Sequence, residues 1–145
     1  MDFTERGVGM SDVSVDHIGI ASESIELASG FWELLGFKQS SEHVNDEQGV
    51  RILILEGNVS SAKIELLEPL GPNTPIGKFI SNHGEGIQQL AVRVEDIEST
   101  ITQLISSGVR MINEQPVNGA SGSIIAFVHP SSTGGVLVEL VEHIN

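Results

Sequence analysis

The chain consists largely of short segments in which apolar and polar residues alternate, each bounded by turn residues. This period of two is typical of β-strands that bury one face. It predicts strands over 15–21, 37–44, 50–55, 62–67, 87–94, 109–112, 124–128 and 136–141. The last of these follows Gly134-Gly135 and is an almost unbroken run of Val and Leu, which indicates a buried strand.

Two other segments carry apolar residues at helical spacing. The first is expected to begin at Ser22 as its N-cap and to end at Gly36. Its predicted core stripe consists of Ile25, Ala28, Phe31, Trp32 and Leu35. The second follows Asp96, a candidate N-cap, and stops at Gly108. Its apolar positions are Ile97, Ile101, Leu104 and Ile105.

The second half of the chain repeats the first. A shift of 72 residues places His17 on Gln89, and a shift of 74 places Glu65 on Glu139. Each half therefore has one polar residue in its first strand and one in its last. Two copies are too few for a solenoid, so the repeat indicates a single pseudo-symmetric protein.

The order of elements predicts an α+β fold of two paired β-α-β-β-β modules that form a curved sheet around a cleft. The predicted boundaries are a flexible lead-in over 1–14, a first module over 15–70, a connector over 71–86 and a second module over 87–145. The connector is expected to hold a short helix capped by Thr74, with Pro75 at its first position.

Four polar residues interrupt otherwise apolar strands: His17, Glu65, Gln89 and Glu139. A buried carboxylate is costly without a partner or a metal ion. We therefore expect the four side chains to converge on one site. Taken singly, His17 also fits a core histidine and the acids fit a solvent-facing side of a sheet, while Gln89 fits a weak ligand or a neutral pocket-lining amide.

Such a group can complete four positions around one divalent cation. Oxygen-rich donor sets favour Mg, Mn, Co, Ni or Zn. An open coordination position would make the cation a Lewis acid toward a carbonyl group. A dioxygenase would need two histidines and one carboxylate, which the Gln at position 89 disfavours.

Composition limits the partners. The 145 residues carry a net charge of −13 with only seven Lys and Arg, which argues against binding to nucleic acid. The sequence has no cysteine, so thiolate ligands and disulfides are excluded. No apolar run approaches the roughly 20 residues that span a bilayer. The polar N-terminus does not resemble a secretory signal, and we expect a cytoplasmic protein.

Several motifs together resemble the vicinal oxygen chelate (glyoxalase/bleomycin resistance) superfamily, and within it the methylmalonyl-CoA epimerases. The resemblance covers nearly the whole chain after residue 14. The segments that carry it are Val15–Ala21, Ala62–Leu70, Pro75–Ile80, Gly84–Ile87, His129-Pro130 and Gly134–Leu140. It implies the glyoxalase fold, a homodimer and an acyl-CoA substrate.

The resemblance also implies site residues. His17, Glu65 and Glu139 would bind a divalent metal ion, with position 89 as the fourth ligand. Family members have histidines where this chain has Gln88-Gln89, so Gln89 is the departure from the pattern. Glu47 and Glu139 would be the two acid–base groups of an epimerase, Glu139 serving as ligand as well.

The leading prediction is a metal-dependent epimerase of an acyl-CoA thioester, acting by α-proton abstraction and a stabilised enolate. A glyoxalase I-like lyase is an alternative with the same ligand arrangement. A second class is a small-molecule binding protein of the same fold that holds its ligand without metal, which the Gln88-Gln89 departure keeps open.

Overall fold

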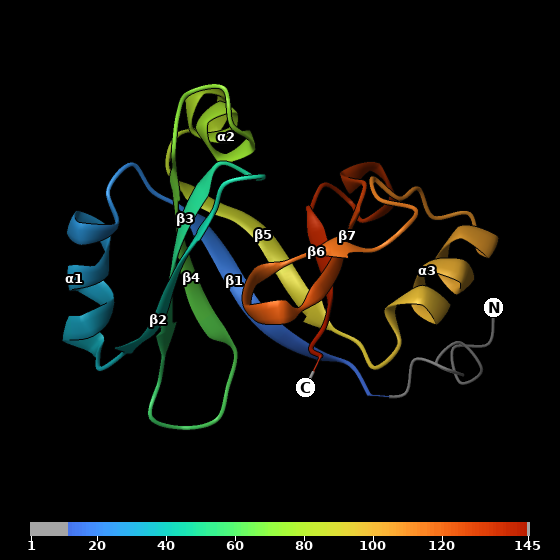
Figure 1. Ribbon diagram of the computed structural model, residues 1–145, viewed down its shortest axis with the longest axis horizontal. Coiled ribbons are helices and arrows are strands. Elements are labelled where there is room, and N and C mark those ends of the chain that lie inside the picture. The colour runs from blue at the N-terminus through green and yellow to red at the C-terminus, as the bar shows by residue number, and fades with distance from the viewer. Residues whose placement is uncertain (1–11, 145) are drawn as a thin grey trace. The chain divides into compact units, whose positions relative to one another are not determined.

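The computed structural model describes residues 12–144, so most of the predicted lead-in lies outside the described residues. The chain divides into two compact units. The first unit comprises His17–Gln89, and the second comprises Leu90–Asn145 with the residues up to Asp16. Figure 1 shows α1 and α2 in the part of the chain that forms the first unit and α3 in the second.

The first unit is built on neighbouring strands in the order β2-β3-β4-β1. β1 and β4 run parallel, whereas β3 is antiparallel to both β2 and β4. The bounds are β1 Ser14–Ala21, β2 Lys38–Asn45, β3 Val50–Glu56 and β4 Lys63–Pro69.

Helix α1 (Ile25–Leu35) covers one face of these strands. The core between them consists of Ile25, Leu53, Leu55, Ile64 and Leu66. Gly36 ends the helix in a left-handed conformation, with φ of 115°, as predicted. The predicted N-cap is wrong by two residues. Ser24 caps the helix by accepting from the Leu27 N–H at 3.2 Å, whereas the Ser22 hydroxyl oxygen accepts from the Ser24 N–H at 3.3 Å.

Helix α2 (Pro75–His83) follows β4, and the structure confirms its predicted cap. The Thr74 hydroxyl accepts from the Gly77 N–H at 3.0 Å, and Pro75 occupies the first turn. Among the described residues no helix is long and apolar enough to cross a membrane.

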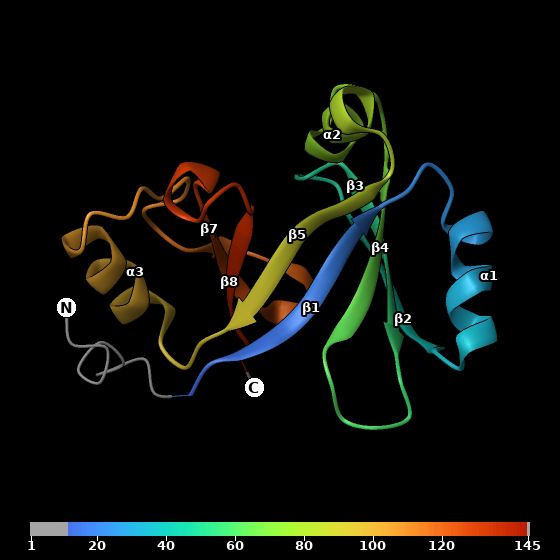
Figure 2. The same cartoon turned by 180° about the vertical axis from the view of Figure 1, so that it is seen from behind.

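Strand β5 begins in the first unit, which ends at Gln89, and continues into the second. In the second unit the neighbouring strands follow in the order β5-β8-β7-β6, and Figure 2 shows β8 beside β5. β5 and β8 run parallel, and β7 is antiparallel to β8. Helix α3 is capped by Asp96, as predicted, and packs on Ala126, Val128 and Leu140. The bounds are β5 Gly86–Arg93, α3 Ile97–Ser106, β6 Val117–Asn118, η1 Ala120–Gly122, β7 Ile124–Val128, η2 Pro130–Ser132 and β8 Val138–Glu142.

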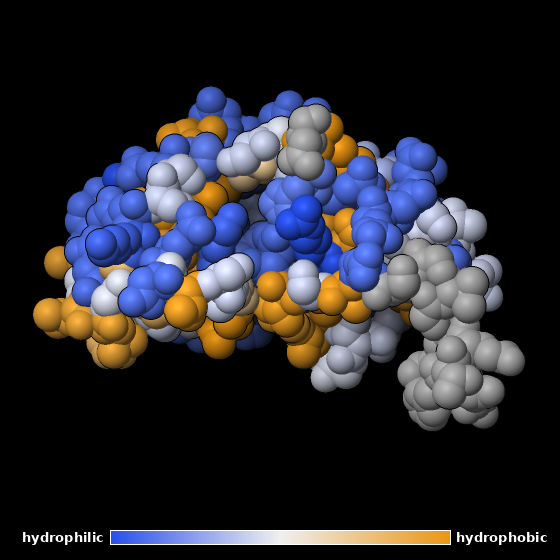
Figure 3. Space-filling view, turned by 90° about the horizontal axis from the view of Figure 1, so that it is seen from below, coloured by the Kyte–Doolittle hydropathy of each residue, from blue (hydrophilic) through white to orange (hydrophobic). Residues whose placement is uncertain are grey.

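Two further sequence expectations are wrong in detail. The strand expected over 109–112 is reduced to a single bridge between Met111 and Val128. Phe31 and Leu35 do not belong to the core of α1 but are exposed. They lie on the side of the helix away from the sheet, and Figure 3 shows hydrophobic atoms gathered at the left edge, where α1 lies in Figure 1.

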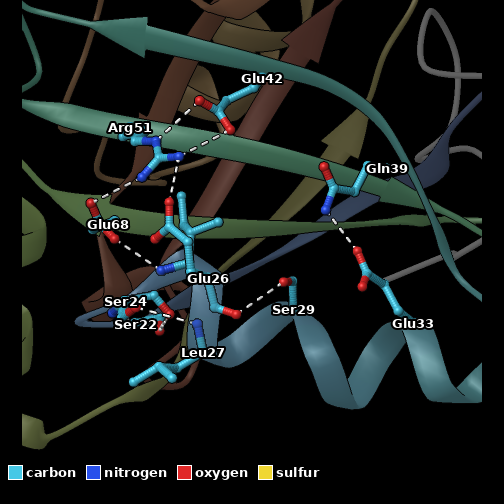
Figure 4. A network of polar contacts seen from close by, with 11 residues as sticks. Ser22, Ser24, Glu26, Leu27, Ser29, Glu33, Gln39, Glu42, Arg51 and Glu68 are labelled. Atoms are coloured by element: carbon cyan, nitrogen blue, oxygen red, sulfur yellow. Dashed lines mark hydrogen bonds and ion pairs between the residues drawn. The ribbon is translucent and has the colours of Figure 1, made fainter.

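The repeat is visible in how each unit holds the start of its helix. In the first unit the Ile25 N–H donates to Glu68 Oε1 at 2.9 Å. In the second unit the Ile97 N–H donates to Glu142 Oε1, also at 2.9 Å. In the first unit Arg51 joins Glu68 at 3.5 Å, as Figure 4 shows. The two acids are 74 residues apart, the shift that relates Glu65 to Glu139, so the repeat extends to matching hydrogen bonds.

Candidate active site

Strand register places two of the predicted ligands on one face of the first unit. His17 and Gly19 on β1 are in register with Lys63 and Glu65 on β4. Residues in register point to the same face of a sheet, and successive residues point to opposite faces. Because Ile18 packs toward α1, His17 and Glu65 point away from that helix.

The side chains of His17, Glu65 and Gln89 meet on this face. His17 Nδ1 lies 3.3 Å from Glu65 Oε2, and His17 Nε2 lies 3.5 Å from Gln89 Nε2. All three residues are buried, with exposed fractions between 5% and 8%. The structure therefore brings together three of the four predicted ligands. The imidazole lies between a carboxylate and an amide.

Gly19 makes this meeting possible. A Cβ atom added at Gly19 would lie 2.6 Å from Gln89 Cγ and 3.1 Å from Leu67 Cδ1. Any other residue at this position would displace the Gln89 side chain. Sequence reasoning missed the requirement, although a glycine inside an alternating strand is a known sign of close approach.

Besides His17, Glu65 has apolar neighbours on its own face of the sheet. Ile54 lies opposite Glu65 on β3, and Leu67 follows it on the same face of β4. Both are buried. Electrostatic interactions are stronger in such a low-dielectric setting than in water, so the charge of Glu65 is balanced by close partners or by a cation.

The donor set fits a divalent metal ion. An imidazole nitrogen, a carboxylate oxygen and an amide oxygen are ligands that borderline first-row cations accept. The terminal amide of Gln89 can present its oxygen by rotation of the group. Within the described residues no three His, Cys, Asp or Glu side chains form a metal-binding cluster.

Glu139, the fourth predicted ligand, belongs to the second unit. It is buried in β8, in register with Ala91 on β5 and Phe127 on β7. It occupies the position in the second unit that Glu65 occupies in the first. That Glu139 completes the same site stays a prediction.

Glu47, the predicted acid–base residue, is exposed in the turn between β2 and β3. That turn leads into Val50, the first residue of β3, and Val50 is in register with Pro69 on β4. Pro69 lies four residues beyond Glu65 on the same strand. Four strand residues span about 13 Å, so the backbone of the turn does not contact the His17–Glu65–Gln89 group directly. The catalytic role of Glu47 stays a prediction.

Lys63 and Gln88 are neighbours of the site on β4 and β5. Lys63 is half-buried and in register with His17, a placement that sequence reasoning did not use. The alternation of β4 could have revealed it, because Lys63 precedes Glu65 by two residues. Gln88 precedes Gln89 on β5, and its Oε1 is buried with no hydrogen-bond partner among the described residues.

Comparison with known proteins defines the class. Residues 16–127 match the family model of the Glyoxalase/Bleomycin resistance protein/Dioxygenase superfamily. The chain belongs to this superfamily, which confirms the predicted α+β fold of glyoxalase type.

Within it, the chain belongs to the family of methylmalonyl-CoA epimerases. It is 34% identical to the mitochondrial methylmalonyl-CoA epimerase of Homo sapiens over 128 residues, covering 87% of this chain and 72% of that protein. The structure of methylmalonyl-CoA epimerase from Mycobacterium tuberculosis shares 41% identity and a TM-score of 0.87, over 91% of this chain and 89% of that one.

A second solved structure, methylmalonyl-CoA epimerase in complex with methylmalonyl-CoA and NH4+, shares 35% identity and a TM-score of 0.85. The match covers 90% of this chain and 94% of that one.

Proposed function

We propose that this protein is a metal-dependent epimerase of an acyl-CoA thioester, with methylmalonyl-CoA as the expected substrate and a homodimer as the working form. The observation that carries the proposal is the buried group of His17, Glu65 and Gln89 in a chain of the epimerase family. The relative solved with methylmalonyl-CoA supports the substrate class.

The residues proposed to hold the metal ion are His17, Glu65, Gln89 and Glu139. A divalent cation bound there would act as a Lewis acid toward the thioester oxygen and so favour loss of the neighbouring α-proton. Gly19 supports the ligand set by leaving room for Gln89. Ile54 and Leu67 keep water from the Glu65 carboxylate.

Epimerisation removes a proton from one side of the α-carbon and returns a proton to the other side. Two acid–base groups are therefore needed, one on each side. We assign the roles to Glu47 and Glu139, as the family resemblance implies. Glu139 is buried and already shielded from water, whereas Glu47 is exposed and would lose its hydration only when substrate covers the turn.

The substrate carries a free carboxylate besides its thioester. Lys63 supports binding of such an anion, because its ammonium group belongs to the same sheet face as His17. The carboxylate would then have the Lys63 ammonium group and the proposed metal ion as its two cationic partners. This gives the proposed site a means to prefer malonyl-type thioesters over simple acyl-CoA thioesters.

The test is exchange of the substrate α-proton with solvent. Metal-loaded protein in D2O should place one deuterium on C2 of methylmalonyl-CoA. Mass spectrometry or proton NMR measures this incorporation. Glu47→Gln and Glu139→Gln should each slow epimerisation by at least about 100-fold, because each variant keeps only one of the two acid–base groups. Glu56→Gln, which changes an exposed acid at the end of β3, is the matched control and should exchange normally. Absence of exchange by the wild-type protein rules out the proposal.

A second candidate is a metal-free binding protein. It is favoured by the glutamines at positions 88 and 89, since an amide is a weaker ligand than imidazole for most first-row metal ions. Binding of methylmalonyl-CoA in the presence of a strong chelator, measured by calorimetry, separates the two. The epimerase predicts affinity that depends on added metal, and the binding protein predicts affinity that does not.

A further inference from the structure

The turn that carries Glu47 packs against the segment that leads into helix α2. Gly49 follows Glu47 by two residues in the turn between β2 and β3, and it is buried although Glu47 is exposed. The Gly49 carbonyl accepts the Leu70 N–H at 2.8 Å. Leu70 comes directly after β4 and begins the connector to α2. Figures 1 and 2 both show this turn beside α2.

Position 49 requires a glycine for two reasons. Its φ is +66°, in the left-handed region that other residues rarely adopt. A Cβ atom added there would overlap Thr74 Cγ2 and lie 3.0 Å from Thr74 Cβ. The backbone of Gly49 therefore lies directly against the Thr74 side chain, with no room for a further atom.

Thr74 is held in turn by the helix that it caps. Its hydroxyl accepts the Gly77 N–H at 3.0 Å and donates to the Gly71 carbonyl at 2.7 Å. Gly77 is buried, and an added Cβ there would lie 2.8 Å from the Pro72 carbonyl oxygen, so the connector packs closely on the first turn of α2. Because the hydroxyl and the methyl group of Thr74 share one Cβ, the two hydrogen bonds also fix the methyl group that faces Gly49.

We propose that Gly49 and Thr74 are positioning residues that hold Glu47 in place for proton transfer. This inference rests on the proposed function, in which Glu47 is one of the two acid–base groups. Surface turns are generally more mobile than the elements that they connect. A displacement of about 1 Å in a reacting group can cost on the order of 100-fold in rate. The capped start of α2 gives the turn a rigid support against such displacements.

The first experiment changes the contact from both sides and measures kcat and KM for epimerisation. Gly49→Ala adds the overlapping atom and should lower kcat by about 10–100-fold with a smaller change in KM. Thr74→Ser removes the methyl group but keeps the hydroxyl that caps α2, and it should lower kcat by about threefold or more. The double variant should recover toward the rate of Thr74→Ser alone, because the methyl group that the new Cβ meets is gone.

The matched control for backbone strain is Gly36→Ala. Gly36 also has a positive φ, 115°, but an added Cβ there meets nothing within 4 Å. Gly36→Ala should therefore lower the Tm through the strain alone and leave kcat unchanged.

The second experiment identifies which acid–base group is affected. In the proposed reaction each group removes the α-proton of one epimer only. Loss of deuterium to H2O from C2-deuterated (2R)- and (2S)-methylmalonyl-CoA, measured separately by mass spectrometry, therefore reports on Glu47 and Glu139 separately. Gly49→Ala and Thr74→Ser should slow the initial loss from the epimer that Glu47→Gln slows, and not from the other. In the Glu47→Gln background, Gly49→Ala should cost no further rate.

The outcomes separate this inference from the proposed function. A wild-type kcat in both Gly49→Ala and Thr74→Ser, equal slowing with both epimers, or a further loss of rate in the Glu47→Gln background would overturn the positioning role while the epimerase stands. Wild-type protein that releases deuterium from neither epimer would overturn both.

Discussion

Replacement of Gly19 by alanine tests the packing on which the site depends. An added Cβ would lie 2.6 Å from Gln89 Cγ, whereas ordinary contact begins near 3.4 Å. Gln89 would have to move by about 0.8 Å, the difference between these two distances. Its amide is already 3.5 Å from His17 Nε2, so a shift of this size breaks the contact.

Overpacking of a buried position costs about 1–3 kcal/mol of unfolding free energy. For a domain of this size that corresponds to a fall in Tm of roughly 3–10 °C. Loss of one properly placed ligand should also weaken divalent-metal binding by about tenfold or more.

Thermal unfolding followed by circular dichroism and competition with a coloured chelator measure the two effects. Gly71→Ala is the matched control, because an added Cβ there meets nothing within 4 Å. It should change stability by no more than about 0.5 kcal/mol. If Gly19→Ala behaves like Gly71→Ala in both assays, the described contact between β1 and Gln89 is wrong.

Three further predictions follow from single contacts. Gln89→His should bind Co²⁺ or Zn²⁺ at least about tenfold more tightly, since imidazole is a better ligand than an amide for these ions; an unchanged chelator competition would count against Gln89 as a ligand. Arg51 holds the pKa of Glu26 below its usual 4.5, mainly through a side-chain hydrogen bond. That lowered pKa stabilises the fold above pH 4.5, and the contribution is lost as the pH falls through the folded-state pKa. Because Arg51 causes the shift, an NMR titration of Arg51→Met should show the pKa of Glu26 returning toward 4.5. Glu68→Gln weakens the acceptor of the Ile25 N–H and should lower the free energy of unfolding by about 0.5–2 kcal/mol. Denaturant titration measures this, and an unchanged free energy of unfolding would contradict the role of Glu68.

The sequence was sufficient for the fold because strand alternation is a strong constraint. Moving a strand by one residue would turn its apolar side chains to the wrong face, so the pattern predicts which side each residue takes. The start of α1 was less determined. Ser22 and Ser24 are both good caps, and the choice depends on Glu85, far along the chain, which accepts from the Ser22 hydroxyl and from the Glu23 N–H.

The site was predictable in part for the same reason. Side chains alternate between the two faces along β1 and β4, and this alternation places His17 and Glu65 on one face. The internal repeat predicts Gln89 as the third residue of the site. Helical spacing alone cannot tell which apolar side of α1 faces the sheet when both sides are apolar, so Phe31 was assigned to the core wrongly. The space that Gly19 leaves for Gln89 depends on distances between strands, which periodicity does not contain.

The most direct test of the central claim is a titration of purified protein with Co²⁺, read by its visible absorption and confirmed by elemental analysis. One equivalent per chain should bind, and His17→Ala, Glu65→Gln and Gln89→Ala should each weaken binding, while Glu56→Gln should leave it unchanged. Failure to bind any divalent metal at saturating concentration, or binding unaffected by the loss of the Glu65 charge, would contradict the account.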